Sequence, residues 1–154
     1  MKSKFGIVIT NILALLVGIT IGGYLFSDTQ PRSFLAFNRC ENCLNPKELL
    51  GLMASVGVQK TPGLIPSVIL ETDKTIVMQI PIKTEKYHFV IIPKKDIKDV
   101  GQLSKGDEPY LIDAYSVTAE LIRQKHLKRY RMSTNGPGKQ VVAYLHFHLT
   151  GSQS

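Results

Sequence analysis

Two histidines near the end of the chain, His146 and His148, stand one residue apart in "KQVVAYLHFHLTG" (residues 139–151). In a strand, alternate side chains share a face, so Tyr144, His146 and His148 would project together. Two imidazoles on one face of a chain with a formal net charge of +7 could hold a phosphate between them. The same pair could bind a metal ion with a third ligand, or could be two surface histidines on a half-exposed strand.

The start of the chain predicts a membrane anchor. Phe5 to Phe26 contains no charged residue, and a helix of that length rises about 33 Å at ~1.5 Å per residue, enough to cross a bilayer. No A-x-A-like cleavage site follows, as a signal peptide would require. Lys2 and Lys4 should stay in the cytoplasm by the positive-inside rule. We therefore expect an uncleaved, single-pass anchor with the C-terminal domain outside the cytoplasm.

Cys40 and Cys43 are the two cysteines of the chain and form a C-x-x-C pair. Such a pair can be a disulfide, half of a zinc site or a redox centre. An exported domain favours the disulfide. A thioredoxin-like redox centre needs a preceding strand, and no strand-like run comes before Cys40.

The remaining sequence predicts one α+β domain. Asn45, Pro46 and Glu48 are typical of a helix N-terminus, and this helix should end near Gly57. Apolar positions with helical spacing predict a long helix over residues 110–127. Runs rich in β-branched and aromatic residues predict five strands, at residues 67–72, 74–82, 87–93, 128–134 and 140–149. The expected architecture is an antiparallel five-stranded sheet with one long helix packed on it, preceded by a transmembrane helix.

Three segments follow from this pattern: residues 1–26 as the cytoplasmic start and anchor, 27–60 as a linker with the C-x-x-C pair and short helix, and 61–154 as the domain. The composition, 44% apolar and 20% charged, excludes a disordered chain. The sequence has neither an aromatic-interleaved RNA-binding signature nor a helix-turn-helix pattern, so no nucleic-acid partner is predicted.

"QVVAYLHFHLTG" resembles the signature of the histidine triad (HIT) family, in which Q-S-V-x precedes His-φ-His-φ-His-φ-φ. Three further stretches resemble family motifs in the right order: "ILETDKTIVMQI" its first hairpin, "YHFVIIPKKDI" its "G-H-x-L-V-I-P-K-x-H-I", and "TNGPGKQ" its "N-N-G…G-Q" loop. "CENC" is similar to the "C-I-F-C" that opens many members. The resemblance covers about Ile65 to Gly151.

The resemblance implies a mechanism. The middle histidine of the triad, here His146, would attack the α-phosphate of a nucleotide and form a nucleotidyl-histidine that water hydrolyses. A backbone carbonyl would hold the other ring nitrogen of this histidine. The positions matched to phosphate contacts are His148, Asn135, Gly136 and Gln140. Those matched to the nucleotide pocket are Val68, Met78, Gln79 and His88.

Four positions depart from the family pattern. Tyr144 replaces the first histidine of the triad, Val141 the serine of Q-S-V, Asp96 the histidine after P-K-x, and Gln79 the acid that grips the ribose. In zinc-containing members, histidines at or near the Asp96 and Tyr144 positions complete the C-x-x-C site. Their joint replacement argues against zinc, unless His88 and Asp96 complete the site with Cys40 and Cys43 instead. A Cys40–Cys43 disulfide or two free thiols is the better interpretation, and we predict no cofactor.

The function expected from the resemblance is that of a membrane-anchored nucleotide hydrolase or transferase, with a nucleotide or nucleotide-linked small molecule as substrate. The departures favour an alternative, a degenerate HIT-like module that binds a nucleotide or phosphate without turnover. A metal site on His146, His148 and His88 is a third option. Family members commonly pair through the long helix and a sheet edge, so the resemblance is compatible with a homodimer.

Overall fold

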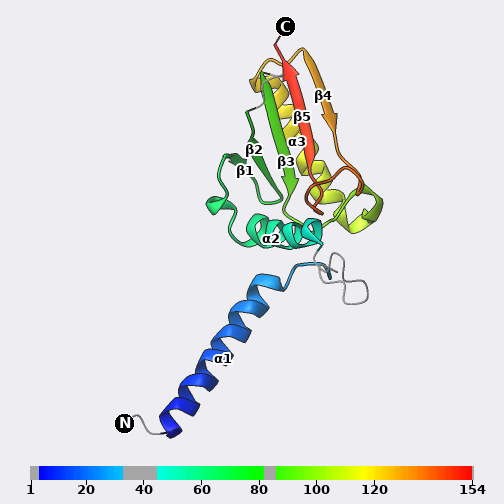
Figure 1. Ribbon diagram of the computed structural model, residues 1–154. Helices are drawn as coiled ribbons and strands as arrows, with labels where there is room; N and C mark the ends of the chain where they lie inside the picture. Colours follow the sequence, from blue (N-terminus) through cyan, green and yellow to red (C-terminus); the bar gives the residue numbers. More distant parts are fainter. Residues whose placement is uncertain (1–3, 33–44, 82–85, 154) are drawn as a thin grey trace.

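The computed structural model describes residues 4–32, 45–81 and 86–153 (Figure 1). These residues contain three α-helices, α1 (Lys4–Phe26), α2 (Pro46–Lys60) and α3 (Glu108–Gln124). Its five strands are β1 (Val68–Glu71), β2 (Thr75–Gln79), β3 (Tyr87–Pro93), β4 (Arg129–Ser133) and β5 (Phe147–Ser152). Short 3₁₀ turns occupy Pro62–Leu64, Val100–Gln102 and Lys105–Asp107.

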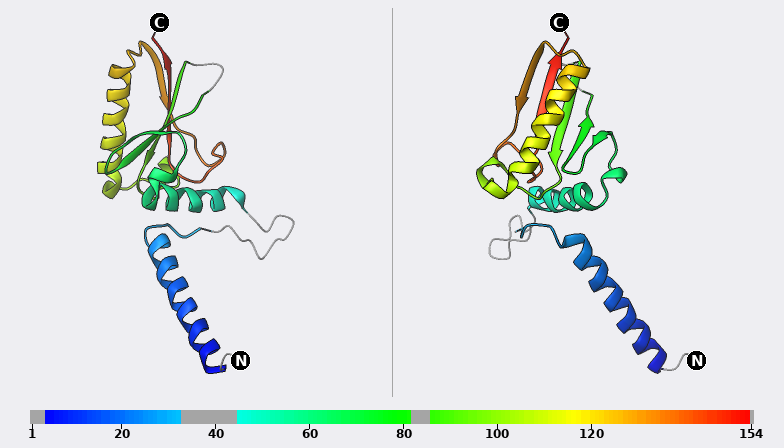
Figure 2. Two further views of the ribbon diagram at one scale, coloured as in Figure 1. Left: turned by 90° about the vertical axis from the view of Figure 1, so that its left-hand side faces the viewer. Right: turned by 180° about the vertical axis from the view of Figure 1, so that it is seen from behind.

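The five strands form one antiparallel sheet in the order β1-β2-β3-β5-β4. α3 packs along one face of this sheet, and α2 lies across its lower end (Figures 1 and 2). β3 is the middle strand and has no exposed residue, as its continuous apolar run predicts. The predicted α+β architecture of five antiparallel strands and one long helix is confirmed.

The two faces of the sheet bury different clusters. The face toward α3 holds the main core, where residues spaced three or four apart on the helix meet alternate residues of the strands: Val77, Phe89, Ile91, Ala114, Val117, Leu121, Leu145, Phe147 and Leu149. The opposite face carries a smaller cluster of Val58, Ile76 and Tyr144. This second face also bears the histidines, because His148 lies between two core residues of β5.

α2 begins as the sequence predicts but ends later. The side chain of Asn45 accepts hydrogen bonds from the amides of Lys47 and Glu48, and Pro46 occupies the first turn. The helix passes through Gly57 and continues to Lys60. Val58, only 2% exposed, packs into the smaller cluster and stabilises this last turn.

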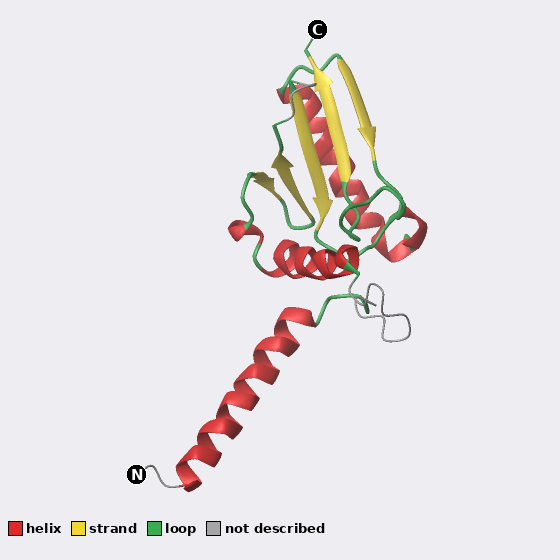
Figure 3. Cartoon of the chain, viewed as in Figure 1, coloured by secondary structure: helices red, strands yellow, loops and turns green. Residues whose placement is uncertain are grey.

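The last strand starts later than expected, at Phe147 instead of residue 140. The backbone before it makes other hydrogen bonds: the amide of Ala143 donates to the carbonyl of Lys47 (3.1 Å), and that of Leu145 donates to the carbonyl of Ile97 (2.6 Å). These bonds hold residues 140–146 against α2 and the loop after β3, and so take them out of the sheet ladder (Figure 3).

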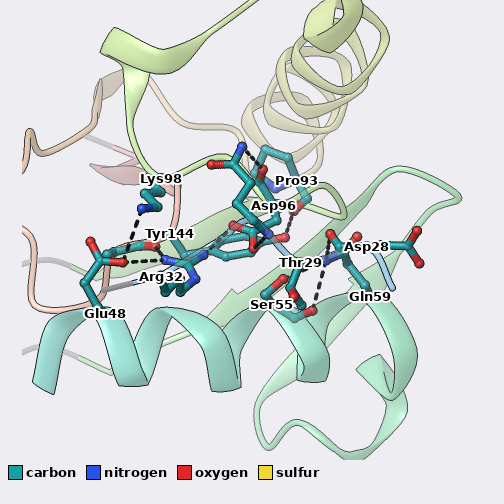
Figure 4. Close-up of polar contacts among 12 residues, drawn as sticks. Asp28, Thr29, Arg32, Glu48, Ser55, Gln59, Pro93, Asp96, Lys98 and Tyr144 are labelled. Carbon is teal, nitrogen blue, oxygen red and sulfur yellow. Dashed lines mark hydrogen bonds and ion pairs between the residues drawn. The ribbon is translucent and has the colours of Figure 1, made fainter. Parts of the chain in front are cut away.

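The segment that follows α1 is fixed to the domain by Arg32. Its guanidinium forms a buried ion pair with Asp96 and donates to the carbonyl of Ala143 (2.6 Å). The amide of Gln30 donates to the same carboxylate (2.8 Å). Figure 4 shows this group between α2 and the sheet, with Glu48 and Tyr144 beside it.

α1 is long and apolar enough to cross a membrane, over Gly6–Phe26, and none of that stretch is buried within the protein. Among the described residues it is the one helix with these properties.

Candidate active site

His146 is oriented by a backbone carbonyl. Its Nδ1 lies 2.7 Å from the carbonyl oxygen of Tyr144. Because a carbonyl can only accept, Nδ1 must carry the ring proton and donate it. The neutral ring then has an unprotonated Nε2, which is the form of imidazole that can attack an electrophile.

His148 lies beside His146 and contacts a third histidine. The centroids of the His146 and His148 rings are 5.0 Å apart, and the rings are nearly perpendicular at 84°. On the neighbouring strand β3, His88 places its Nε2 2.9 Å from Nδ1 of His148. The structure therefore brings together three of the four histidines of the chain.

Two of these histidines are held in the neutral form. Burial lowers the pKa of His148 below its ordinary value, and the positive charges that His146 and His88 can carry lower it further. Burial alone lowers the pKa of His88. Both rings should therefore be neutral at pH 7, and each can donate through only one nitrogen.

An apolar cavity of about 220 Å³ opens next to the histidines. Its lining comes from α2, the residue after β2, strands β3 and β5, and the segment before β5: Ala54, Val58, Ile80, Val90, Ile92, Val142, Tyr144, His146 and His148. Apolar walls with a few polar groups at one edge are typical of small-molecule sites. The sequence places α2 in the linker, yet this helix supplies one wall of the cavity; the apolar residues of the helix are the sequence signal for this role.

The residues expected to line a nucleotide pocket are placed unequally. His88 contacts His148. Met78 pairs with Val90 and with Val68, so all three lie on the histidine face, but Met78 and Val68 do not line the cavity. Gln79 pairs with Phe89, which belongs to the core under α3, so Gln79 lies on the opposite face. The next residue, Ile80, lines the cavity instead.

The expected phosphate-binding residues are separated. Asn135 and Gly136 follow β4 and come directly after Thr134, whose hydroxyl donates to the carbonyl of His146 (2.8 Å). Thr134, not singled out from the sequence, thus holds this segment beside His146. Gln140 is buried, donates to the carbonyl of Lys98 (3.2 Å) and lines a separate cavity at the N-terminal end of α2.

The departures from the family pattern have structural partners. Tyr144 is 2% exposed, and its hydroxyl donates to the carbonyl of Pro93 (2.9 Å). Burial, followed by the charge of Asp96, raises the pKa of Tyr144, so this hydroxyl stays protonated. Asp96 pairs with Arg32. Val141 is 72% exposed and does not line the apolar cavity.

Cys40 and Cys43 lie outside the described residues. Within residues 4–32, 45–81 and 86–153, no three His, Cys, Asp or Glu side chains are placed to hold a metal ion, the three clustered histidines included.

Comparisons with known proteins agree with this geometry. Residues 63–154 match the family described as the scavenger mRNA decapping enzyme C-terminal binding domain. A HIT family hydrolase from Clostridium thermocellum is 26% identical, with a TM-score of 0.56 over 63% of this chain and 89% of that one. A HIT family hydrolase from Legionella pneumophila Philadelphia 1 is 25% identical, with a TM-score of 0.56 over 63% and 91%.

An Aprataxin-like protein from Drosophila melanogaster is 30% identical over 61 residues, which are 39% of this chain and 9% of that protein. The chain thus spans less than a tenth of this relative. The family match covers more than half of the chain and includes all five strands, α3 and the three histidines. The protein belongs to the scavenger mRNA decapping enzyme C-terminal family and carries a HIT-like domain.

Proposed function

We propose that this protein is a membrane-anchored nucleotide hydrolase or transferase that acts at an α-phosphate through a nucleotidyl-histidine on His146. The observation that carries the proposal is the 2.7 Å contact between His146 Nδ1 and the Tyr144 carbonyl, which leaves Nε2 free to attack. The HIT family hydrolases to which the domain is similar support the same class of reaction.

The reaction has two steps. Nε2 of His146 attacks the α-phosphorus, a P–N bond forms, and the bond from phosphorus to the leaving group breaks with its electron pair going to that group. Nδ1 keeps its proton and continues to donate it to the Tyr144 carbonyl, so the nucleotidyl-imidazole is cationic and is itself a good leaving group. Water or another acceptor then attacks phosphorus, loses a proton to solvent, and releases Nε2 of His146 with its lone pair.

The remaining residues would bind and orient the substrate. His148 would donate to a phosphate oxygen, and the segment at Asn135 and Gly136 would approach the same group. The apolar cavity of about 220 Å³ would receive the base or another apolar part of the substrate.

The test is turnover by the full chain in detergent, with adenosine phosphoramidate, diadenosine polyphosphates and CDP-linked lipids as substrates. His146→Asn should lower kcat by at least about a thousandfold, because no other group can form the covalent intermediate. His126→Asn is the matched control. His126 is exposed, follows the C-cap of α3, and has a positive φ of 50° that asparagine tolerates. Equal turnover by the two variants would exclude a nucleophile at His146.

The anchor would place this site near a membrane surface. Beyond the end of α1, Asp28 pairs with Lys60 of α2, and the Lys60 ammonium also lies 4.7 Å from the centre of the Tyr24 ring. α2 in turn supplies Ala54 and Val58 to the cavity wall. Membrane fractionation with alkaline extraction should retain the full chain and release a variant that lacks residues 1–26, and externally added protease should reach the domain.

The alternative is a module that binds a nucleotide without turnover. Tyr144 and Val141, in place of histidine and serine, favour it because the groups nearest the leaving group are changed. Calorimetry that shows tight nucleotide binding while every candidate substrate stays intact would establish this alternative.

A further inference from the structure

Two arginines lie on the same face of the sheet as the active-site histidines. Along β5, His148, Thr150 and Ser152 share that face. On the edge strand β4, their cross-strand partners are Ser133, Arg131 and Arg129, respectively. Cross-strand partners project from the same side, so Arg131 is a diagonal neighbour of His148, at about 7–8 Å between backbones.

This position makes His148 the boundary between two different surfaces. On its β3 side the paired residue is Val90, a wall of the apolar cavity. On its β4 side the paired residue is Ser133, followed by Arg131 and Arg129. Figure 1 shows this side of β3, β5 and β4 with no helix in front of it, while α3 lies behind.

The arginine side is a polar groove of about 490 Å³, lined by Arg129, Tyr130, Arg131, Thr150, Gly151 and Ser152. Both arginines are exposed, and neither side chain forms an ion pair or hydrogen bond with any other described residue. β3, β4 and β5 carry no acidic residue at all. The two guanidinium groups are therefore free to bind an anion.

We propose that this groove is a leaving-group subsite that binds a chain of phosphates beyond the α-phosphate. The inference rests on the proposed function, because it takes the α-phosphate to lie at His146 and His148. With the base in the apolar cavity on the β3 side, the phosphate chain continues along β5 toward Thr150. Arg131 is the first guanidinium that it meets, and Arg129 the second.

The subsite would act on the step in which the leaving group departs. When His146 Nε2 bonds to the α-phosphorus, the bond between that phosphorus and the bridging oxygen breaks, and the electron pair goes to that oxygen, which leaves on the first phosphate of the departing chain. A guanidinium binds phosphate oxygens through paired N–H groups and so stabilises this developing charge. A small neutral leaving group such as ammonia gains nothing from these arginines.

The test compares two adenosine substrates in the full chain, adenosine tetraphosphate and adenosine phosphoramidate. Arg131→Gln should lower the ratio of kcat/KM for the tetraphosphate to that for the phosphoramidate by about tenfold, as expected for the loss of a charged hydrogen bond, and Arg129→Gln by less. Arg123→Gln is the control, because Arg123 is exposed on α3 and pairs with Glu120. An unchanged ratio in Arg131→Gln, or the same change in Arg123→Gln, would overturn the proposal.

A second measurement does not depend on turnover. Inorganic tripolyphosphate should bind the full chain in calorimetry, more weakly at high salt, and Arg131→Gln should raise its Kd by about tenfold. If neither substrate is turned over, the proposed function fails, and this titration alone decides the subsite. No binding of tripolyphosphate would overturn it, as would tighter binding of a single-stranded oligonucleotide through the same arginines.

Discussion

His88 donates a hydrogen bond from Nε2 to Nδ1 of His148, across 2.9 Å. The direction follows from the other nitrogen of His88, because Nδ1 is buried and has no partner in the described part of the chain. If His148 were the donor, neutral His88 would carry its proton on that buried Nδ1, and a buried N–H without an acceptor is costly and rare. His148 therefore holds its own proton on Nε2, the nitrogen that can donate to a phosphate.

Replacing His88 should impair turnover through His148. His88→Leu removes the donor that fixes the tautomer of His148, and kcat should fall about tenfold to a hundredfold, the effect of a lost buried hydrogen-bond partner of ~1–3 kcal/mol. His88→Gln can place an amide N–H near the same point and should restore part of the activity. Steady-state kinetics on both variants tests this, and equal losses in the two would mean that His88 contributes only packing.

Stability should depend on pH through the same pair. Folding lowers the pKa of His88 and of His148, mainly by burial, so the unfolded chain takes up protons before the folded one does. The free energy of unfolding should be at its full value above about pH 6.5, the ordinary pKa of histidine, and should fall as the pH drops below it. Urea denaturation at pH 7.5 and 5.5 measures the difference. In His88→Leu the difference should be smaller, because one of the two buried imidazoles is removed; an unchanged difference would contradict this origin of the pH dependence.

The fold and the grouping of the site could be predicted because both depend on local patterns. Alternation along β5 predicts that His148 projects from the face of the sheet opposite to that of its core neighbours. The glycine- and proline-rich stretch before β5 predicts a loop next to the site. Tyr144 and His146 share the histidine face although neither lies in the strand. The side chain of His146 donates to the carbonyl of Tyr144, and the hydroxyl of Thr134 donates to the carbonyl of His146. These bonds hold this segment in place without the backbone hydrogen bonds of a sheet.

Other parts depend on contacts between residues far apart in the sequence. From the sequence, Asp96 is only the residue that replaces a zinc-site histidine. The folded chain shows that Arg32, 64 residues earlier, forms an ion pair with it. Gln79 was placed in the pocket by motif position, but its pairing with Phe89 turns it to the other face. No local pattern carries either piece of information.

The Arg32–Asp96 pair predicts a large effect on stability. Each side chain is 1% exposed, so removing one partner leaves a buried charge without its counter-ion. Arg32→Met should lower the free energy of unfolding by about 3–5 kcal/mol, and adding Asp96→Asn should recover part of that loss. Chemical denaturation of the single and double variants measures both. Arg123→Met, which breaks an exposed pair, should change stability by no more than about 1 kcal/mol.

Filling the apolar cavity from α2 should weaken nucleotide binding. Ala54 lines the cavity, and Ala54→Phe would occupy much of its volume of about 220 Å³. KM for a nucleotide substrate should rise by at least about tenfold, since the base loses its contact area. Met53→Phe is the control, because Met53 is the neighbouring residue of α2 but is 63% exposed. An unchanged KM in Ala54→Phe would show that the base binds elsewhere.

The hydroxyl of Tyr144, at the position of the first triad histidine, donates a hydrogen bond to the carbonyl of Pro93, and it can be removed without changing the ring. In Tyr144→Phe the buried Pro93 carbonyl loses its donor, which should lower the free energy of unfolding by about 1–3 kcal/mol. The backbone carbonyl that orients His146 belongs to the same residue, so any loosening of the ring should also appear in kcat more than in KM. Denaturation and kinetics of Tyr144→Phe, compared with Tyr115→Phe on α3, where Tyr115 is 57% exposed, separate these effects. Equal stability of the two variants would mean that the Tyr144–Pro93 bond contributes nothing, and that packing of the ring alone keeps Tyr144 at this position.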